Sequence, residues 1–99
     1  MSNFQKPIVF MIARQHPFET SCSYLMDGFL RAMVQDTKAL RSLLELCEIH
    51  IVPMLNVDGV IAGNSRVNLA GQDLNRQWHT SADDTRSEVT LVKRYLLGF

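Results

Sequence analysis

The hydrophobic residues of the chain form two short continuous runs, and stretches with helical spacing lie between and after them. Residues 8–13 (IVFMIA) and 49–54 (IHIVPM) each predict a buried strand, because a short apolar run is typical of a strand covered on both faces. Between them, apolar residues recur at steps of three and four, which predicts one helix over residues 20–33 and a shorter one after residue 36. The order strand, helices, strand predicts a βαβ unit with parallel strands.

Polar residues at the expected helix starts support these boundaries. Thr20 or Ser21 is a suitable N-cap for the first helix, and Asp36 or Thr37 for the second. Residues 85–88 (TRSE) have the spacing of a capping box, which predicts a last helix. Its apolar face would consist of Val89, Val92, Leu96 and Phe99.

Residues 55–84 interrupt this regular pattern. They are rich in Asn, Asp and Gly, and we expect a long loop. Loops of this length are uncommon in compact domains and often carry function.

Composition narrows the class of protein. Ninety-nine residues suffice for one small domain, and a 46% hydrophobic content is ordinary for a globular protein. Ten basic residues balance ten acidic ones, so bulk charge gives no reason to expect a nucleic-acid or membrane partner. The start of the chain lacks the basic and apolar segments of a signal peptide, and no apolar run is long enough to span a membrane. We therefore expect a cytoplasmic protein, in which Cys22 and Cys47 are free thiols.

The first candidate site lies at the exit of the first strand, where His16 and Glu19 are three residues apart. Imidazole nitrogen and carboxylate oxygen are both zinc ligands, and open α/β sheets bind ligands at the carboxyl ends of their strands. The spacing alone also occurs often by chance, so the pair by itself leaves a structural role open.

A second group of candidates lies in the expected loop. Arg66, Asn75 and Arg76 offer two guanidinium groups and an amide, which suit a substrate with a free carboxylate. The alternative is that both arginines are solvated loop charges. The other two histidines are weaker candidates for metal ligands: His50 alternates within an apolar strand and fits a sheet-face position, and His79 lies in a polar stretch.

Three segments together resemble a known family. They are residues 13–20 (ARQHPFET), 52–60 (VPMLNVDGV) and 64–78 (NSRVNLAGQDLNRQW). In this order they look like the zinc metallocarboxypeptidases, and most like the cytosolic branch that removes glutamates from tubulin tails. The resemblance implies an α/β fold with a mixed sheet flanked by helices, of which residues 1–99 would form the first part of the catalytic domain.

The resemblance also implies roles for individual residues. His16 and Glu19 match the first two zinc ligands, and Arg66 matches the arginine that stabilises the oxyanion formed at the scissile carbonyl. Asn75 and Arg76 match the pair that binds the terminal carboxylate of a peptide or protein substrate. The third zinc ligand, a substrate-binding tyrosine and the general-base glutamate of the family would lie beyond residue 99.

Two local departures from the family pattern affect these expectations. Phe18 stands where the branch has glycine, so its side chain must point away from the metal or the loop must shift. Val57 replaces the proline of an Asn-Pro-Asp-Gly turn. Whether the chain alone is an enzyme stays open: the competing interpretation is a non-catalytic remnant whose unpaired strand edges and apolar faces bind a partner.

Overall fold

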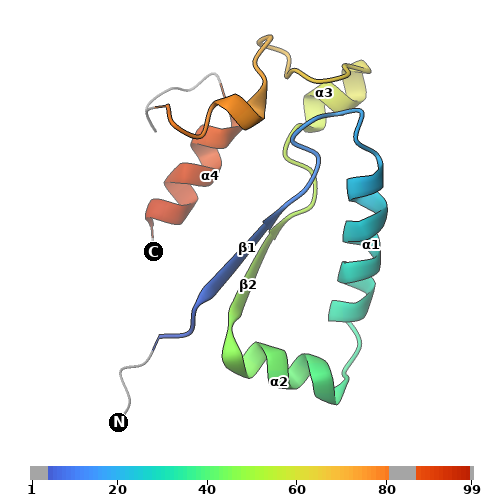
Figure 1. Ribbon diagram of the computed structural model, residues 1–99, viewed down its shortest axis with the longest axis vertical. Coiled ribbons are helices and arrows are strands. Elements are labelled where there is room, and N and C mark those ends of the chain that lie inside the picture. Colours follow the sequence, from blue (N-terminus) through green and yellow to red (C-terminus); the bar gives the residue numbers. More distant parts are fainter. Residues whose placement is uncertain (1–4, 81–86, 99) are drawn as a thin grey trace.

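The computed structural model of the chain describes residues 5–80 and 87–98. Two strands and five helices follow one another in these residues (Figure 1). They are β1 (Ile8–Ile12), α1 (Ser21–Met33), α2 (Lys38–Leu46), β2 (Glu48–Val52), α3 (Val57–Ala62), the 3-10 helix η1 (Leu74–Arg76) and α4 (Glu88–Leu97).

The two strands pair in parallel, with Ile8 opposite Glu48 and Ile12 opposite Val52. Backbone hydrogen bonds continue past the strand ends, because Ala13 N donates to Val52 O and Leu55 N donates to Ala13 O, each at 3.0 Å. Helices α1 and α2 form the crossover between the strands, as a parallel pair requires. The predicted βαβ unit and α/β fold class are confirmed.

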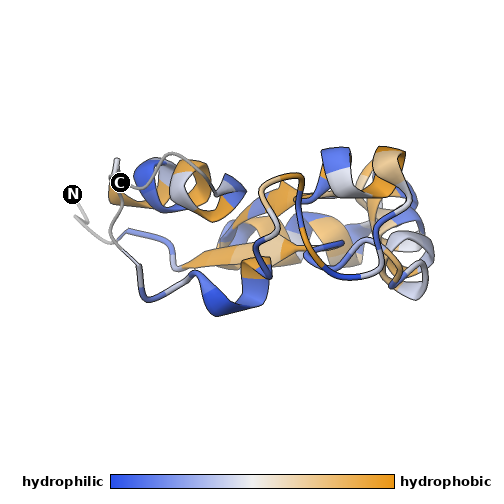
Figure 2. Ribbon diagram, turned by 90° about the horizontal axis from the view of Figure 1, so that it is seen from above, coloured by the Kyte–Doolittle hydropathy of each residue, from blue (hydrophilic) through white to orange (hydrophobic). Residues whose placement is uncertain are grey.

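The helices lie on both sides of this sheet (Figure 1). Helix α4 and η1 cover one side, where a cluster of buried residues forms the core. Figure 2 shows that hydrophobic residues follow the strands through the centre of the molecule. The core cluster consists of Leu55, Leu74, Val89 and Val92, with Phe10, Ile12, Val52 and Trp78 packed against it.

The other side is covered much less closely, by α1 alongside the strands and by α2 near the start of β2 (Figure 1). Met26 is the buried residue of α1, whereas Leu25 is 68% exposed and α2 has no buried residue. A cavity of about 450 Å³ lies between α1 and β1, and one of about 500 Å³ lies between the strands and α4, so the two sides differ in which residues are buried and not in the space left open. The radius of gyration is 15.8 Å, compared with about 13 Å for a compact domain of this length. The described residues therefore form an open, thin structure.

The expected helix starts are mostly confirmed. Thr37 caps α2 by accepting a hydrogen bond from Leu40 N, whereas Thr20 occupies the N-cap position of α1 without such a bond. Helix α4 is capped by Ser87, which accepts from Val89 N, in place of the expected capping box. Thr85, Arg86 and Phe99 lie outside the described residues.

The expectation of a continuous loop over residues 55–84 was wrong in two places. Helix α3 begins after Asn56, whose side chain accepts from Gly59 N, and η1 begins after Asp73, whose side chain accepts from Asn75 N. Both elements are too short to show helical periodicity, so only their capping residues could have indicated them. None of the helices in residues 5–80 and 87–98 is both long and apolar enough to cross a lipid bilayer.

Candidate functional site

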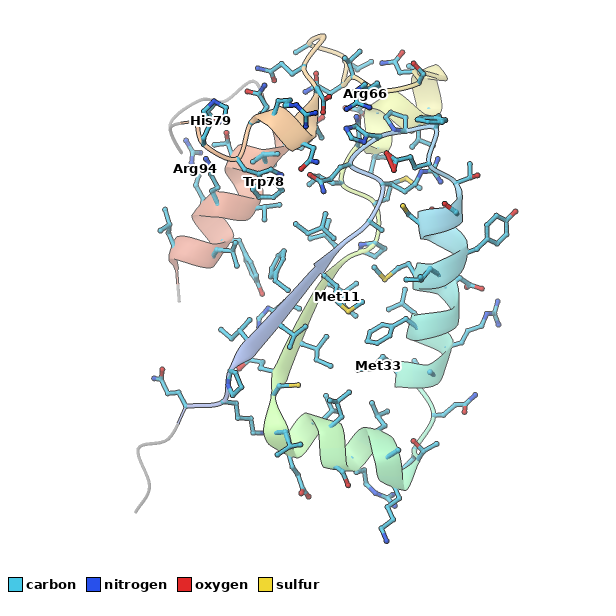
Figure 3. The ribbon with its side chains drawn as sticks, viewed as in Figure 1. Met11, Met33, Arg66, Trp78, His79 and Arg94 are labelled. Carbon is cyan, nitrogen blue, oxygen red and sulfur yellow. The ribbon has the colours of Figure 1, made fainter. Side chains whose placement is uncertain are left out.

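The candidate residues gather where both strands end. Residues 13–20 leave β1 there, α3 follows β2, and residues 64–76 cross above them (Figure 1). Figure 3 shows Arg66 beside α3 at this end of the molecule, while Trp78 and His79 lie toward α4. Trp78 ties the two parts together, because its indole Nε1 donates to Gln15 Oε1 at 2.8 Å.

His16 is the centre of the site. Its side chain is only 10% exposed and lies between two carboxylates. Nδ1 is 2.5 Å from Glu19 Oε1, and Nε2 is 2.8 Å from Asp73 Oδ1. The structure therefore brings the two predicted ligands together, and it adds a carboxylate from a segment far away in the sequence.

Asp73 links His16 to Arg66. Its second oxygen accepts a hydrogen bond of 2.6 Å from Arg66 Nε, and its first oxygen also accepts from the backbone N–H of Asn75 at 3.0 Å. Burial alone would raise the pKa of the Asp73 carboxyl group, but the hydrogen bonds from His16, Arg66 and the backbone outweigh burial and lower that pKa to about 2. Asp73 is thus a carboxylate at neutral pH and orients both side chains.

Sequence reasoning missed Asp73 as a site residue. Its position two residues before Asn75 is typical of a carboxylate that accepts a backbone N–H in a turn. Its contact with His16 spans 57 residues, and no local pattern predicts such a contact.

Asn56 holds the segment that carries His16. It is completely buried, its backbone N–H donates to Arg14 O at 3.0 Å, and its side-chain Nδ2 donates to Gln15 O at 3.2 Å. A Cβ atom on Gly59 would lie 2.7 Å from Pro17 Cγ and 2.8 Å from Asn56 Cγ, so only glycine leaves room for this contact. The Asn56–Gly59 turn of the second sequence segment therefore supports the first.

Asn68 organises the segment that carries Arg66 and Asp73. It is 3% exposed, and its Oδ1 accepts from the backbone N–H groups of Ala70 and Gln72 at 3.0 and 2.9 Å. Its Nδ2 donates to Glu88 Oε2 at 2.8 Å, which joins the segment to the first turn of α4.

The other predicted site residues are more exposed. Asn75 and Arg76 both lie in η1, and Arg76 Nη1 donates to Asn75 O at 3.1 Å. Their assignment to a substrate carboxylate stays a prediction, as do the roles of His16, Glu19 and Arg66. The side chain of Phe18 is directed outward, since Phe18 is 62% exposed while its N–H donates to Ser65 O at 3.2 Å.

The other two histidines lie away from this group. His50 is on the sheet, with Nδ1 2.5 Å from the Tyr95 hydroxyl and Nε2 2.6 Å from Glu48 Oε1, as expected for a sheet-face histidine. His79 is exposed. Within the part of the chain that the structure describes, no cluster of three His, Cys, Asp or Glu side chains has the arrangement of a complete metal site.

Comparison with known proteins now places the chain in a family. The family model of the zinc carboxypeptidases (peptidase M14) matches residues 2–95. Cytosolic carboxypeptidase 1 of Homo sapiens is 44% identical over 91 residues, and cytosolic carboxypeptidase 6 of Caenorhabditis elegans is 38% identical over 94 residues. The chain belongs to the zinc carboxypeptidase family, and these similar proteins are named as its cytosolic branch.

Solved structures agree. A metallo-carboxypeptidase from Burkholderia cenocepacia matches with a TM-score of 0.86 and 35% identity over 100% of this chain. One from Pseudomonas aeruginosa matches with a TM-score of 0.84 and 33% identity over 99% of the chain. The chain corresponds to 27% and 26% of those two proteins, and to only 7% of the human relative and 20% of the worm relative. The fold described above is therefore a fragment of the carboxypeptidase fold.

Proposed function

We propose that the chain forms the first part of the catalytic domain of a zinc carboxypeptidase, in which His16 and Glu19 are two of the zinc ligands. The observation that carries this proposal is the contact of 2.5 Å between His16 Nδ1 and Glu19 Oε1, with His16 Nε2 held by Asp73. One nitrogen and one carboxylate oxygen facing each other are a donor set that suits zinc. A carboxylate behind the ring is the usual support of a zinc-bound histidine.

Asp73 determines which nitrogen of His16 is free for the metal. When Nε2–H donates to Asp73, the lone pair of Nδ1 is directed toward Glu19. Bound zinc would act as a Lewis acid on water and on the substrate carbonyl. A catalytic zinc site normally has three protein ligands, so we expect the third ligand and the general base to come from residues beyond this chain.

The arginines would act on the substrate. Arg66 is already oriented by its hydrogen bond of 2.6 Å to Asp73, and we assign it to the oxyanion that develops on the carbonyl. Arg76 and Asn75 would bind the free α-carboxylate that every carboxypeptidase substrate carries, and would thereby define an exopeptidase.

The substrate class follows from the branch. Because the similar proteins are named cytosolic carboxypeptidases, we propose a cytoplasmic enzyme that acts on the C-terminus of a peptide or protein, with the glutamates of tubulin tails as the specific substrate to test.

Zinc titration of the 99-residue chain tests the metal site. Calorimetry should detect weak one-to-one binding that is lost in both His16→Ala and Glu19→Ala. His79→Ala is the matched control, because His79 is an exposed histidine outside the proposed site, and it should bind zinc like the wild type. Binding that survives both ligand substitutions, or that requires His79, would refute the assignment.

The roles of the arginines can be separated by kinetics in a fusion that supplies the remainder of the domain. Arg66→Ala should lower kcat by roughly two to three orders of magnitude, as expected for loss of an oxyanion donor. Arg76→Ala should mainly raise KM, because it removes a contact made both before and during the reaction. A change in KM alone for Arg66→Ala would contradict these roles. Preferred removal of a C-terminal leucine over a C-terminal glutamate in a peptide panel would contradict the assignment to a glutamate-removing branch.

A further inference from the structure

Arg14 has an unusual backbone conformation. Its φ is +57°, and among the described residues it is the one non-glycine residue with positive φ. The left-handed region is unfavourable for a residue with a Cβ atom, and only the surrounding structure can hold it there. Backbone strain of this kind often accompanies a functional site.

The side chain of Arg14 is buried against the segment between His16 and Glu19. Arg14 is 8% exposed, and both Nε and Nη2 donate to Pro17 O, at 3.1 and 2.6 Å. Nη1 donates to Ser23 Oγ at 2.8 Å, in the first turn of α1. One guanidinium group thus joins the end of β1, the peptide after Pro17 and the start of α1.

This arrangement is costly for stability. In residues 5–80 and 87–98, no carboxylate lies within ion-pair distance of Arg14, so its charge is buried with hydrogen bonds alone. A buried charge without an opposite charge is unfavourable, and neutral acceptors offset only part of that cost. A strained backbone and an uncompensated charge at one residue are difficult to explain by stability alone.

We propose that Arg14 is a positioning residue for the metal site: it fixes the Pro17 carbonyl so that His16 Nδ1 and Glu19 Oε1 face each other. This inference rests on the proposed zinc-binding function of these two residues. Other hydrogen bonds hold the neighbouring backbone, namely Glu19 N to His16 O at 3.3 Å, Thr20 N to Phe18 O at 2.8 Å and Phe18 N to Ser65 O at 3.2 Å, but among the described residues only Arg14 donates to the Pro17 carbonyl. The forked guanidinium places two donors on one carbonyl oxygen, which a lysine ammonium cannot reproduce while also reaching Ser23.

Arg14→Lys tests the proposal, with Arg31→Lys as the matched control. Arg31 is an exposed arginine of α1 that pairs with Asp27 at 2.9 Å, so its substitution changes the same chemistry away from the site. Three quantities are measured on the whole chain: the imidazole ¹⁵N chemical shifts of His16 without metal, the affinity for Zn²⁺, and the melting temperature.

We expect Arg14→Lys to move the His16 ¹⁵N shifts toward those of a free histidine and to weaken Zn²⁺ binding roughly tenfold, the usual size of an effect from outside the ligand set. Arg31→Lys should change neither quantity. A lower melting temperature with unchanged His16 shifts and unchanged Zn²⁺ affinity would mean a purely structural role and would overturn the proposal. An equal effect of Arg31→Lys would overturn it as well.

Ser23→Ala is a second test of the proposal, which is needed if the Arg14→Lys variant does not fold. It removes one acceptor of Arg14 from a half-buried position and leaves the arginine in place. It should shift the His16 resonances in the same direction by a smaller amount, and unchanged resonances would overturn the proposal. If the wild-type chain binds no zinc through His16 and Glu19, the proposed function fails, while the metal-free ¹⁵N shifts still decide the role of Arg14.

Discussion

The candidate site and the layer formed by α1 and α2 differ in how closely their side chains are held by neighbouring residues. At the site, His16, Asn56, Asn68 and Asp73 are each held by several specific hydrogen bonds between 2.5 and 3.4 Å. In the α1–α2 layer, Leu25 and Leu46 are 68% and 69% exposed, and Met26 is the one buried residue of the two helices.

The difference shows that hydrogen bonds between described residues organise the site, whereas α1 and α2 bury only Met26 within the described residues. A hydrogen-bonded turn needs only its own few partners, and each of these is present. Hydrophobic burial instead requires a large complementary surface. Substitutions in the two regions should therefore change the free energy of unfolding by different amounts, and in some cases in opposite directions.

The largest difference between the two regions is expected for alanine substitutions of Gly59 at the site and Gly28 in α1. Gly59→Ala would place a Cβ against Asn56 and Pro17, which must move, and we expect a loss of about 3 kcal/mol in the free energy of unfolding, typical of overpacking. Urea denaturation at low micromolar protein concentration measures it.

Gly28→Ala is the matched control in α1. A Cβ at Gly28 would meet no atom within 4 Å apart from the backbone of its own helix, and alanine favours a helix over glycine, so the free energy of unfolding should rise by about 0.5–1 kcal/mol. Equal effects of both substitutions would remove the distinction between a tightly organised site and a loosely packed layer.

The second comparison is between alanine substitutions of Val89 in α4 and Leu25 in α1. Val89 in α4 is completely buried in the core, so Val89→Ala should lower the free energy of unfolding by about 2 kcal/mol through lost packing and a new cavity. Leu25→Ala in α1 should change it by less than about 0.5 kcal/mol, as for a surface position. A loss of similar size at Leu25 would show that α1 packs closely against the sheet in solution.

The smallest effect concerns Val57, the first residue of α3. It is 45% exposed and directly follows the N-cap Asn56. Proline is favoured at this first helical position because the φ of proline matches the helix, and because an N–H at this position would have no acceptor within the helix. Val57→Pro should stabilise the chain by about 0.5–1 kcal/mol, mainly by restricting the unfolded state. Val57→Ala does not restrict the unfolded state in this way and should not stabilise the chain. If Val57→Pro destabilises the chain, the turn depends on the valine.

The sequence anticipated the regular elements well. The two apolar runs correspond to β1 and β2, and the three- and four-residue spacing corresponds to α1 and α2. The prediction that both strands are buried was wrong, because no residue within β1 or β2 is buried and Ile8 and Val9 are exposed. The two short helices inside residues 55–84 were not anticipated, since a turn or two of helix has no readable period. The apolar face expected for α1 exists in the sequence, but only Met26 is buried, because burial depends on what lies opposite.

What the sequence alone determined is local: the strand and helix positions, and the pairing of His16 with Glu19 across three residues at the exit of a strand. Only the tertiary structure brought Asp73 to the far side of His16, and only it placed the buried Arg14 in a left-handed conformation against Pro17. The physical reason is the separation in sequence over which each kind of interaction acts. Periodicity and capping act over a few residues, whereas contacts across 57 residues form only after parallel pairing brings both strand ends, and the segments that leave them, to one edge of the sheet.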